Sequence, residues 1–274
     1  MSALTESAPP TTTHPLRAEV GIADPPPIPF GRIVRMELRK SFDTRAGFWL
    51  LASIGIAAVL ATVATIVWAP DDVLGFESFA TAIGVPMAVL LPIVAILSVT
   101  SEWSQRTGLS TFTLVPRRSR TIAAKATGAL LVGVVSMVVA MGIGALGTVL
   151  GASLRGVDVV WDTSTAGLAR IVLAQVLGMA VGFMLGVLLR SSPGAIVGYF
   201  VFSFVLPTLA MALAAFQDWF KDLQPWVDFN YAQTKLFDDA LSGTEWTQLG
   251  VTGLFWLVVP TALGLWALLR AEIR

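Results

Sequence analysis

The chain has 274 residues, of which 55% are hydrophobic and only 13% charged, and its mean hydropathy of +0.76 is typical of a membrane protein. It contains no cysteine, and its single histidine, His14, lies in a tail rich in proline and threonine. Disulfide frameworks, thiolate metal sites and cysteine nucleophiles are therefore excluded, and histidine-based chemistry is disfavoured. The 18 basic residues balance 18 acidic ones, which argues against a nucleic-acid-binding protein.

The first 46 residues divide into two parts. Residues 1–29 hold seven of the 15 prolines and no apolar run, so we expect a disordered cytoplasmic tail and not a signal peptide. Residues 30–46 are predicted to form an amphipathic helix along the inner headgroups, with a positively charged flank that only sets topology as the alternative. The apolar stripe of this helix consists of Phe30, Ile33, Val34, Leu38 and Phe42, and its basic arc contains Arg32, Arg35, Arg39 and Lys40.

Six apolar segments are long enough to cross a bilayer, which requires about 20 residues in a helix. None of them contains Asp, Glu, Lys or Arg. The sequence therefore predicts an all-α polytopic membrane protein with a six-span transmembrane domain over residues 47–274. The predicted spans are residues 47–69, 78–100, 126–150, 171–189, 195–216 and 247–269.

The basic residues predict the orientation, because positively charged connections stay in the cytoplasm. Fourteen of the 18 lysines and arginines fall on the side that carries both termini. Only Arg155, Arg170, Lys221 and Lys235 fall on the other side. We therefore expect a multi-pass protein of the bacterial inner (plasma) membrane with both termini in the cytoplasm.

Glycine and proline motifs in the spans predict packing more than chemistry. No lysine follows the glycines of a phosphate-binding P-loop, so ATP hydrolysis by that route is excluded. Gly178, Gly182 and Gly186 recur four residues apart and allow another helix to approach closely, either within this subunit or in a second copy. Pro86, Pro92 and Pro207 should bend their helices.

Polar groups within the spans are few. Besides serines and threonines, the candidates are Gln175 and Tyr199. Proton-relay and ion-coupled mechanisms normally use intramembrane charges, so their absence from the predicted spans disfavours a secondary transporter. Transport of an amphipathic or apolar substrate, driven from elsewhere, fits better.

The connection between the second and third spans mixes a carboxylate, a glycine, apolar residues and a Pro-Arg-Arg corner. It predicts a short amphipathic helix parallel to the inner leaflet that ends at Pro116, with arginines placed for phosphate headgroups or an acidic partner. The alternative is an ordinary basic loop that sets topology. The residues concerned are Glu102, Arg106, Gly108, Leu109, Phe112, Leu114, Pro116, Arg117, Arg118 and Lys125.

This connection resembles the first cytoplasmic loop of the permease subunits of type-2 ATP-binding-cassette (ABC) exporters. The resemblance extends over about residues 30–274, since the basic helix before the first span and the amphipathic outer segment before the last span also match. It implies a short cytoplasmic coupling helix that docks into a separate ABC ATPase, with ATP and Mg bound by that partner and no cofactor or metal bound by this chain. It also implies a second permease copy, as a homodimer or a paralogous heterodimer.

The same resemblance implies roles for individual residues. Glu102 would orient the loop or meet a basic group of the ATPase, and Leu109 and Phe112 would fill the ATPase cleft, together with the surrounding Arg106, Gly108, Leu114 and Pro116. Anchoring to lipid phosphates would fall to Arg117 and Arg118, and from the preceding helix to Arg35, Arg39 and Lys40. The chain itself would not be an enzyme.

The outer segment 217–246 carries aromatic residues among carboxylates, which is typical of an interfacial anchor, with a lid over a substrate exit as the alternative. The sequence thus predicts the permease of an ATP-driven exporter of a drug, lipid or related substrate. A non-transporting membrane scaffold, or an intramembrane lipid-modifying enzyme, are the alternative functions, and the enzyme would need a catalytic set that the spans lack.

Overall fold

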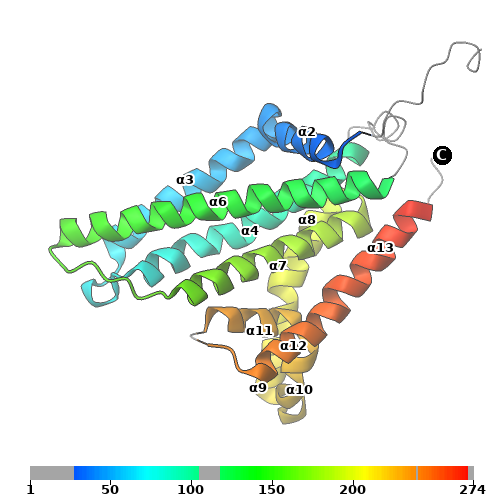
Figure 1. Ribbon diagram of the computed structural model, residues 1–274. Helices are drawn as coiled ribbons and strands as arrows, with labels where there is room; N and C mark the ends of the chain where they lie inside the picture. Colours follow the sequence, from blue (N-terminus) through cyan, green and yellow to red (C-terminus); the bar gives the residue numbers. More distant parts are fainter. Residues whose placement is uncertain (1–27, 105–117, 239, 271–274) are drawn as a thin grey trace, which may run out of the picture.

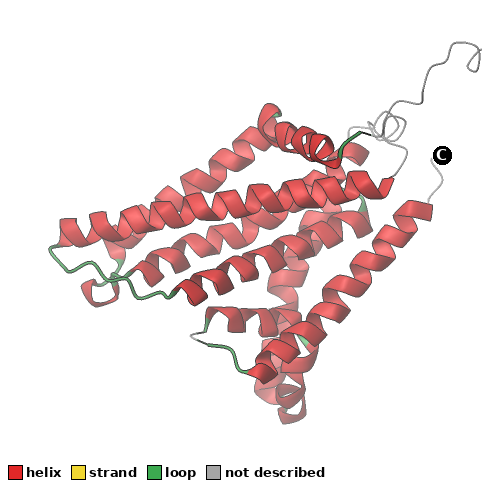
Figure 2. Cartoon of the chain, viewed as in Figure 1, coloured by secondary structure: helices red, strands yellow, loops and turns green. Residues whose placement is uncertain are grey.

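The computed structural model describes residues 28–104, 118–238 and 240–270, and this part of the chain is almost entirely helical (Figure 2). Six helical units are long and apolar enough to cross a membrane, which confirms the predicted all-α polytopic fold. The first four are α3 (Arg45–Trp68), α4 (Phe76–Ser104), α6 (Arg118–Arg155) and α7 (Thr165–Leu189). The fifth joins α8 (Ser192–Phe200), the π turn η2 (Val201–Val205) and α9 (Leu206–Phe216), and the sixth joins α12 (Gly243–Gly253), the π turn η4 (Leu254–Val258) and α13 (Val259–Arg270).

The helices α4 and α7 form the centre of the bundle. In each of them 44% of the most apolar window is buried, against 11% for the fifth unit and 17% for the sixth. α3 and α6 pack beside α4, while α8 and α13 pack beside α7 (Figure 1). The fifth and sixth units therefore leave most of their apolar surface to lipid or to another protein chain.

The bundle has two distinct ends (Figure 1). At one of them, which we name the α2 end, lie α2 (Phe30–Asp43), the end of α4, the start of α6 and the end of α13. At the other, the α11 end, lie the start of α7 and the short helices α10 (Asp218–Val227) and α11 (Phe229–Thr234), followed by the 3₁₀ turn η3 (Lys235–Phe237).

The helix α2 is separated from α3 by Thr44, whose backbone is extended and whose hydroxyl oxygen accepts a hydrogen bond from the Gly47 backbone N–H at 3.1 Å. Ile33 and Val34 are buried against Ala124 of α6, and Leu38 packs beside them. The middle of the apolar stripe therefore contacts protein, whereas Phe30 and Phe42 near its two ends are exposed.

Arg155 joins the connections at the α11 end, where the 3₁₀ turn η1 (Asp71–Val73) follows α3. Its guanidinium contacts the Asp71 carboxylate at 2.6 Å and donates to the backbone oxygens of Ile66 and Ala69. Since Asp71 is 58% exposed, the ion pair itself is worth at most about 1 kcal/mol. By donating to the last carbonyls of α3, Arg155 caps the C-terminal end of this helix, where the helix dipole also favours a cation.

The third and fifth helical units differ in form from the predicted spans. α6 extends over Arg118–Arg155, well beyond the predicted 126–150, because polar residues at its ends continue the helix on both sides of the apolar stretch. The fifth unit is interrupted by η2, where the Leu206 N–H bonds to the carbonyl of Val201, five residues back. In the sixth unit the Val259 N–H bonds to Leu254 in the same way.

Candidate functional site

Most of the predicted coupling segment lies outside the described residues. This holds for Arg106, Gly108, Leu109, Phe112, Leu114, Pro116 and Arg117, whereas Glu102 falls in the last turn of α4 and Arg118 begins α6. Both flanking helix ends belong to the α2 end of the bundle (Figure 1).

An ion-paired cluster fastens α2 to the start of α6. The Glu37 carboxylate contacts Lys40 Nζ at 3.0 Å and Lys125 Nζ at 3.0 Å, and the Lys125 side chain is only 4% exposed. Arg120 of α6 also donates to the carbonyl of Ile28 at 2.8 Å, just before α2 begins. Helix α2 is thus held by two hydrogen-bonded contacts of α6 in addition to its buried apolar residues.

The basic residues predicted to anchor α2 to lipid lie on its exposed side. Arg35, Arg39 and Lys40 are all exposed, and Lys40 also contacts Glu37. This placement leaves the two guanidinium groups accessible from outside the protein. Arg118 lies on the same end of the bundle, at the first position of α6.

The three glycines of α7 face α4 of the same chain. A Cβ atom at Gly182 would lie 2.6 Å from the carbonyl oxygen of Pro92, and one at Gly186 would lie 3.3 Å from that of Ile96. At Gly178 the nearest atoms, at 3.8 Å, belong to Pro92, Tyr199 and Gln233. Their lack of side chains allows the two central helices to approach closely.

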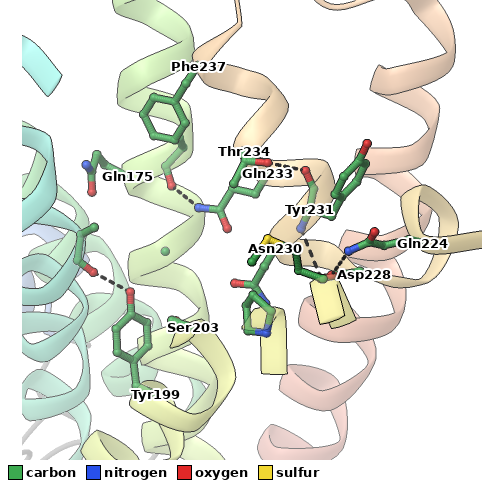
Figure 3. A pocket seen from close by; sticks show the side chains of 15 residues that line it. Gln175, Tyr199, Ser203, Gln224, Asp228, Asn230, Tyr231, Gln233, Thr234 and Phe237 are labelled. Atoms are coloured by element: carbon green, nitrogen blue, oxygen red, sulfur yellow. Dashed lines mark hydrogen bonds between the residues drawn. The ribbon is translucent and has the colours of Figure 1, made fainter. Parts of the chain in front are cut away.

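A cavity of about 350 Å³ lies toward the α11 end, between α4, α7, the fifth unit and the α10–α11 segment (Figure 3). Its apolar lining includes Ala88, Pro207 and Met211. Its polar lining is unusually rich for a membrane protein interior, and consists of Gln175, Tyr199, Ser203, Gln224, Asp228, Asn230, Tyr231, Gln233 and Thr234. Gln175 and Tyr199, which the sequence singles out, are among them.

Tyr199 compensates for a proline in the neighbouring helix. Pro92 has no N–H, so the carbonyl of Ala88, four residues earlier in α4, lacks its normal helical donor. The Tyr199 hydroxyl donates to this oxygen at 2.6 Å (Figure 3). An unsatisfied carbonyl at this depth would cost several kcal/mol, so the bond stabilises the contact between α4 and α8.

Asn230 likewise donates to an open backbone carbonyl, in the fifth unit. In η2 the Leu206 N–H bonds to Val201 and not to Phe202, and the next residue, Pro207, has no N–H. The carbonyl of Phe202 is therefore left free by its own helix, and Asn230 Nδ2 of α11 donates to it at 3.1 Å. The π turn and the proline together provide the attachment point of α11.

Three further side-chain amides also donate outward from the cavity. Gln233 Nε2 donates to the Ala174 carbonyl of α7 at 2.7 Å, and Gln175 Nε2 donates to that of Gly84 at 3.3 Å. Gln224 Nε2 donates to Asp228 Oδ2 at 3.1 Å, and Asp228 Oδ1 accepts the Tyr231 backbone N–H as the N-cap of α11. The α10–α11 segment is therefore hydrogen-bonded into the bundle and not merely laid over it.

The sixth unit holds the same segment from the other side. Trp256 of η4 donates its indole N–H to the carbonyl of Val227 at 2.7 Å, and its ring packs edge-on against Phe202 of η2 with centroids 5.7 Å apart. Phe229 of α11 is 1% exposed and lies 6.5 Å from the Phe202 ring. The two π turns thus contact each other and both contact the α10–α11 segment.

The sequence contains a signal for this site that periodicity does not reveal. A proline inside a span removes a helical donor, and a polar side chain elsewhere can satisfy the carbonyl left open, as Tyr199 does for Ala88. Residues 201–208 and 254–261 also share the pattern Phe-x-x-Val-x-Pro-Thr, in which Thr208 and Thr261 donate to the carbonyls of Phe204 and Leu257 at 2.7 and 2.6 Å. The pattern accompanies a π turn in both units.

Comparison with known proteins identifies one family. The model of the family described as "ABC-2 family transporter protein" matches residues 22–273, which is nearly the whole chain. No curated protein matches the chain.

Proposed function

The chain belongs to the ABC-2 family of transporter proteins, and from this premise we propose that it is the permease of an ATP-driven exporter. In this proposal it moves an amphipathic or apolar substrate out of the cytoplasm, using the ATPase activity of a separate subunit. The observation that carries it is the family match across nearly the whole chain, joined to a sequence that has no P-loop of its own. ATP and Mg would then be bound by the partner.

Energy would enter through the segment from Glu102 to Pro116. The predicted spans carry no acidic or basic residue, so a mechanism based on ion coupling lacks its usual groups. The segment connects α4 to α6, and α2 is fastened to α6 by the Glu37–Lys125 contact. A displacement imposed on the segment by an ATPase would therefore act on α4, α6 and α2 together.

The charge distribution supports an orientation in the membrane, and the exposed apolar surface supports a second permease copy. In this proposal the α2 end and both termini lie in the cytoplasm and the protein in the inner (plasma) membrane, which the excess of lysine and arginine at the α2 end supports. The little-buried fifth and sixth units are compatible with a second permease copy, identical or paralogous. Native mass measurement of the complex in mild detergent should show two permease chains, and a strictly monomeric permease in an active complex would contradict this part.

The test of the coupling role replaces Leu109 and Phe112 together with aspartate. Charged side chains at a contact that must lose water should prevent docking, since uncompensated burial of a charge costs several kcal/mol. The spans are unchanged, so insertion and protein level should be normal. Co-purification of the ATPase and substrate-stimulated ATP turnover in liposomes are measured, and both should be lost.

Two control variants make this test specific. Replacement of Val20 and Ile22 with aspartate adds the same charge to the segment before α2 and should leave both readouts unchanged. Glu102→Lys should weaken them less than the double aspartate variant, because a pair at a rim is partly screened by salt. Wild-type association and turnover in the Leu109 and Phe112 variant would refute the coupling role and favour a non-transporting scaffold.

A further inference from the structure

The cavity beside α11 presents several hydrogen-bond acceptors. An amide side chain has a donor nitrogen and an acceptor oxygen, and backbone carbonyls and carboxylates can only accept. The nitrogens of Gln175, Gln224, Asn230 and Gln233 are all committed to such acceptors. One N–H of each amide is therefore bound, which fixes the orientation of the group and leaves its oxygen available to a ligand.

These amide oxygens have no competing partner in the part of the chain that the structure describes. None of the hydrogen bonds within the described ranges has one of the four oxygens as its acceptor, and none of these oxygens is buried without access. The cavity therefore offers these four oxygens to a ligand that donates hydrogen bonds.

The cavity also carries a negative charge, which favours a cationic ligand. Asp228 is the one carboxylate among the lining residues, and no lysine or arginine lines the cavity within the described ranges. The nearby Lys235 contacts Asp238 at 3.2 Å, and the hydrogen bond with Asp238 raises the pKa of Lys235. Its Nζ also lies 5.5 Å from the Tyr231 ring centroid, so this lysine is engaged by Asp238 and Tyr231.

The rest of the lining is apolar or aromatic. Tyr199 and Phe237 contribute rings, whose faces attract cations, and Ala88, Pro207 and Met211 contribute aliphatic surface. Met211 is 66% and Phe237 54% exposed, so the cavity is reached past these two residues. Its volume of about 350 Å³ is at the small end of the range of ligand sites.

We propose that this cavity binds a protonated amine carried on an apolar body, and that amphipathic amines are the substrate class of the transporter. The amine donates to the amide oxygens and is attracted by Asp228, while its apolar part contacts Met211 and the aromatic rings. The binding site stands on the cavity alone, whereas its role as a substrate site rests on the proposed transport function.

The test measures binding to the full chain in nanodiscs of phosphatidylcholine, without an ATPase. The probe is a dansyl group joined by a hexyl chain to a primary amine, and its N-acetylated form serves as a neutral analogue of nearly the same shape. Fluorescence titration, corrected with empty nanodiscs, should give a Kd for the amine at least about tenfold lower than for the neutral analogue. Equal dissociation constants, or no binding of the amine, would overturn the proposal.

A pair of matched variants assigns the effect to the cavity. Asp228→Asn removes the charge and keeps an N-cap oxygen for the Tyr231 N–H, and it should raise the Kd of the amine about tenfold without changing that of the neutral analogue. Asp222→Asn removes an exposed carboxylate of α10 outside the cavity and should leave both constants unchanged. Equal effects of the two variants would mean that only surface charge is sensed, which would overturn the cavity assignment.

Two further measurements distinguish a soluble amine from a lipid amine, and the binding site from the transport function. Adding phosphatidylethanolamine to the nanodiscs should leave the Kd unchanged if the ligand is a soluble amine, whereas competition would identify a lipid headgroup amine as the ligand. Amine binding that depends on Asp228 in a protein that recruits no ATPase would preserve the site and refute the transport function. ATPase recruitment by a protein that does not bind the amine would support the transport function and refute the amine site.

Discussion

At the scale of single residues, prolines within the spans create requirements that other helices meet. Pro92 leaves the carbonyl of Ala88 open, and Tyr199 donates to it. Pro207 and the π turn together leave the carbonyl of Phe202 open, and Asn230 donates to it. Because a helix normally satisfies its own backbone, such carbonyls are specific attachment points in an otherwise non-directional apolar interior. They position α8 against α4 and α11 against the fifth unit.

The Tyr199 contact can be tested by restoring the missing donor. Tyr199→Phe should lower the free energy of unfolding by about 1–3 kcal/mol, because it leaves the Ala88 carbonyl without a partner. Pro92→Ala returns a helical N–H to that carbonyl, so Tyr199→Phe in this background should cost less than half as much. Denaturant unfolding in detergent of the four proteins of the cycle measures the coupling. Additive effects of the two substitutions would contradict the explanation.

At the scale of elements, α2 is a docked helix and not only a charged flank. Glu37 and Lys125 approach within 3.0 Å, with side-chain exposures of 10% and 4%, so removing the charge of Glu37 deprives a buried ammonium of a charged partner. Glu37→Gln should loosen α2 by about 1.5–3 kcal/mol, the typical worth of a hydrogen bond to a charged group. Hydrogen exchange of α2 peptides should accelerate accordingly. Asp43→Asn, at the exposed end of the same helix, should not accelerate exchange, and an equal effect of both variants would refute this docking contact.

The contact between α4 and α7 gives an independent prediction for glycine. Gly182→Ala would place a Cβ atom 2.6 Å from the Pro92 carbonyl oxygen, so backbone must move and the free energy of unfolding should fall by about 1–3 kcal/mol. Gly142→Ala in α6 meets no atom within 4 Å and should be neutral or slightly stabilising. Thermal unfolding in detergent compares the two, and equal stabilities would show that the helices are less closely packed than the structure indicates.

The elements differ in how far the sequence predicts them. Six apolar stretches predict six spans because bilayer thickness demands that length, and this was confirmed. Periodicity could not predict the π turns or the insertion of α10–α11, since both depend on contacts between residues distant in sequence, such as Asn230 with Phe202. The pairing of Glu37 with Lys125 across 88 positions was hidden for the same reason. The coupling residues from Arg106 to Pro116 remain predictions, as they lie outside the described residues.

At the scale of the whole molecule, burial is distributed asymmetrically. The four helices α3, α4, α6 and α7 share a continuous interior, whereas the fifth and sixth units contact it through α7, through the packing of α8 on α4 and through the α10–α11 segment. The proposed amine cavity lies where these two parts meet. A change in their relative position would therefore alter the cavity directly, and the hydrogen bonds of Gln233 and Asn230 would be among the first contacts affected.

The orientation of the whole bundle can be tested at the two ends of a single helix. Ser119 and Ser153 are both exposed and lie in the first and last turns of α6, so cysteines introduced there differ in side of the membrane and little else. Since the basic residues concentrate at the α2 end, the cysteine at residue 119 should resist a membrane-impermeant thiol reagent in intact cells, and the one at residue 153 should be labelled.

The chain has no native cysteine, so no background labelling of this protein arises. Permeabilised cells should label both positions, which controls for accessibility. Labelling of residue 119 alone in intact cells would invert the molecule, place the acidic α10–α11 segment in the cytoplasm and remove the coupling segment from reach of a cytoplasmic ATPase.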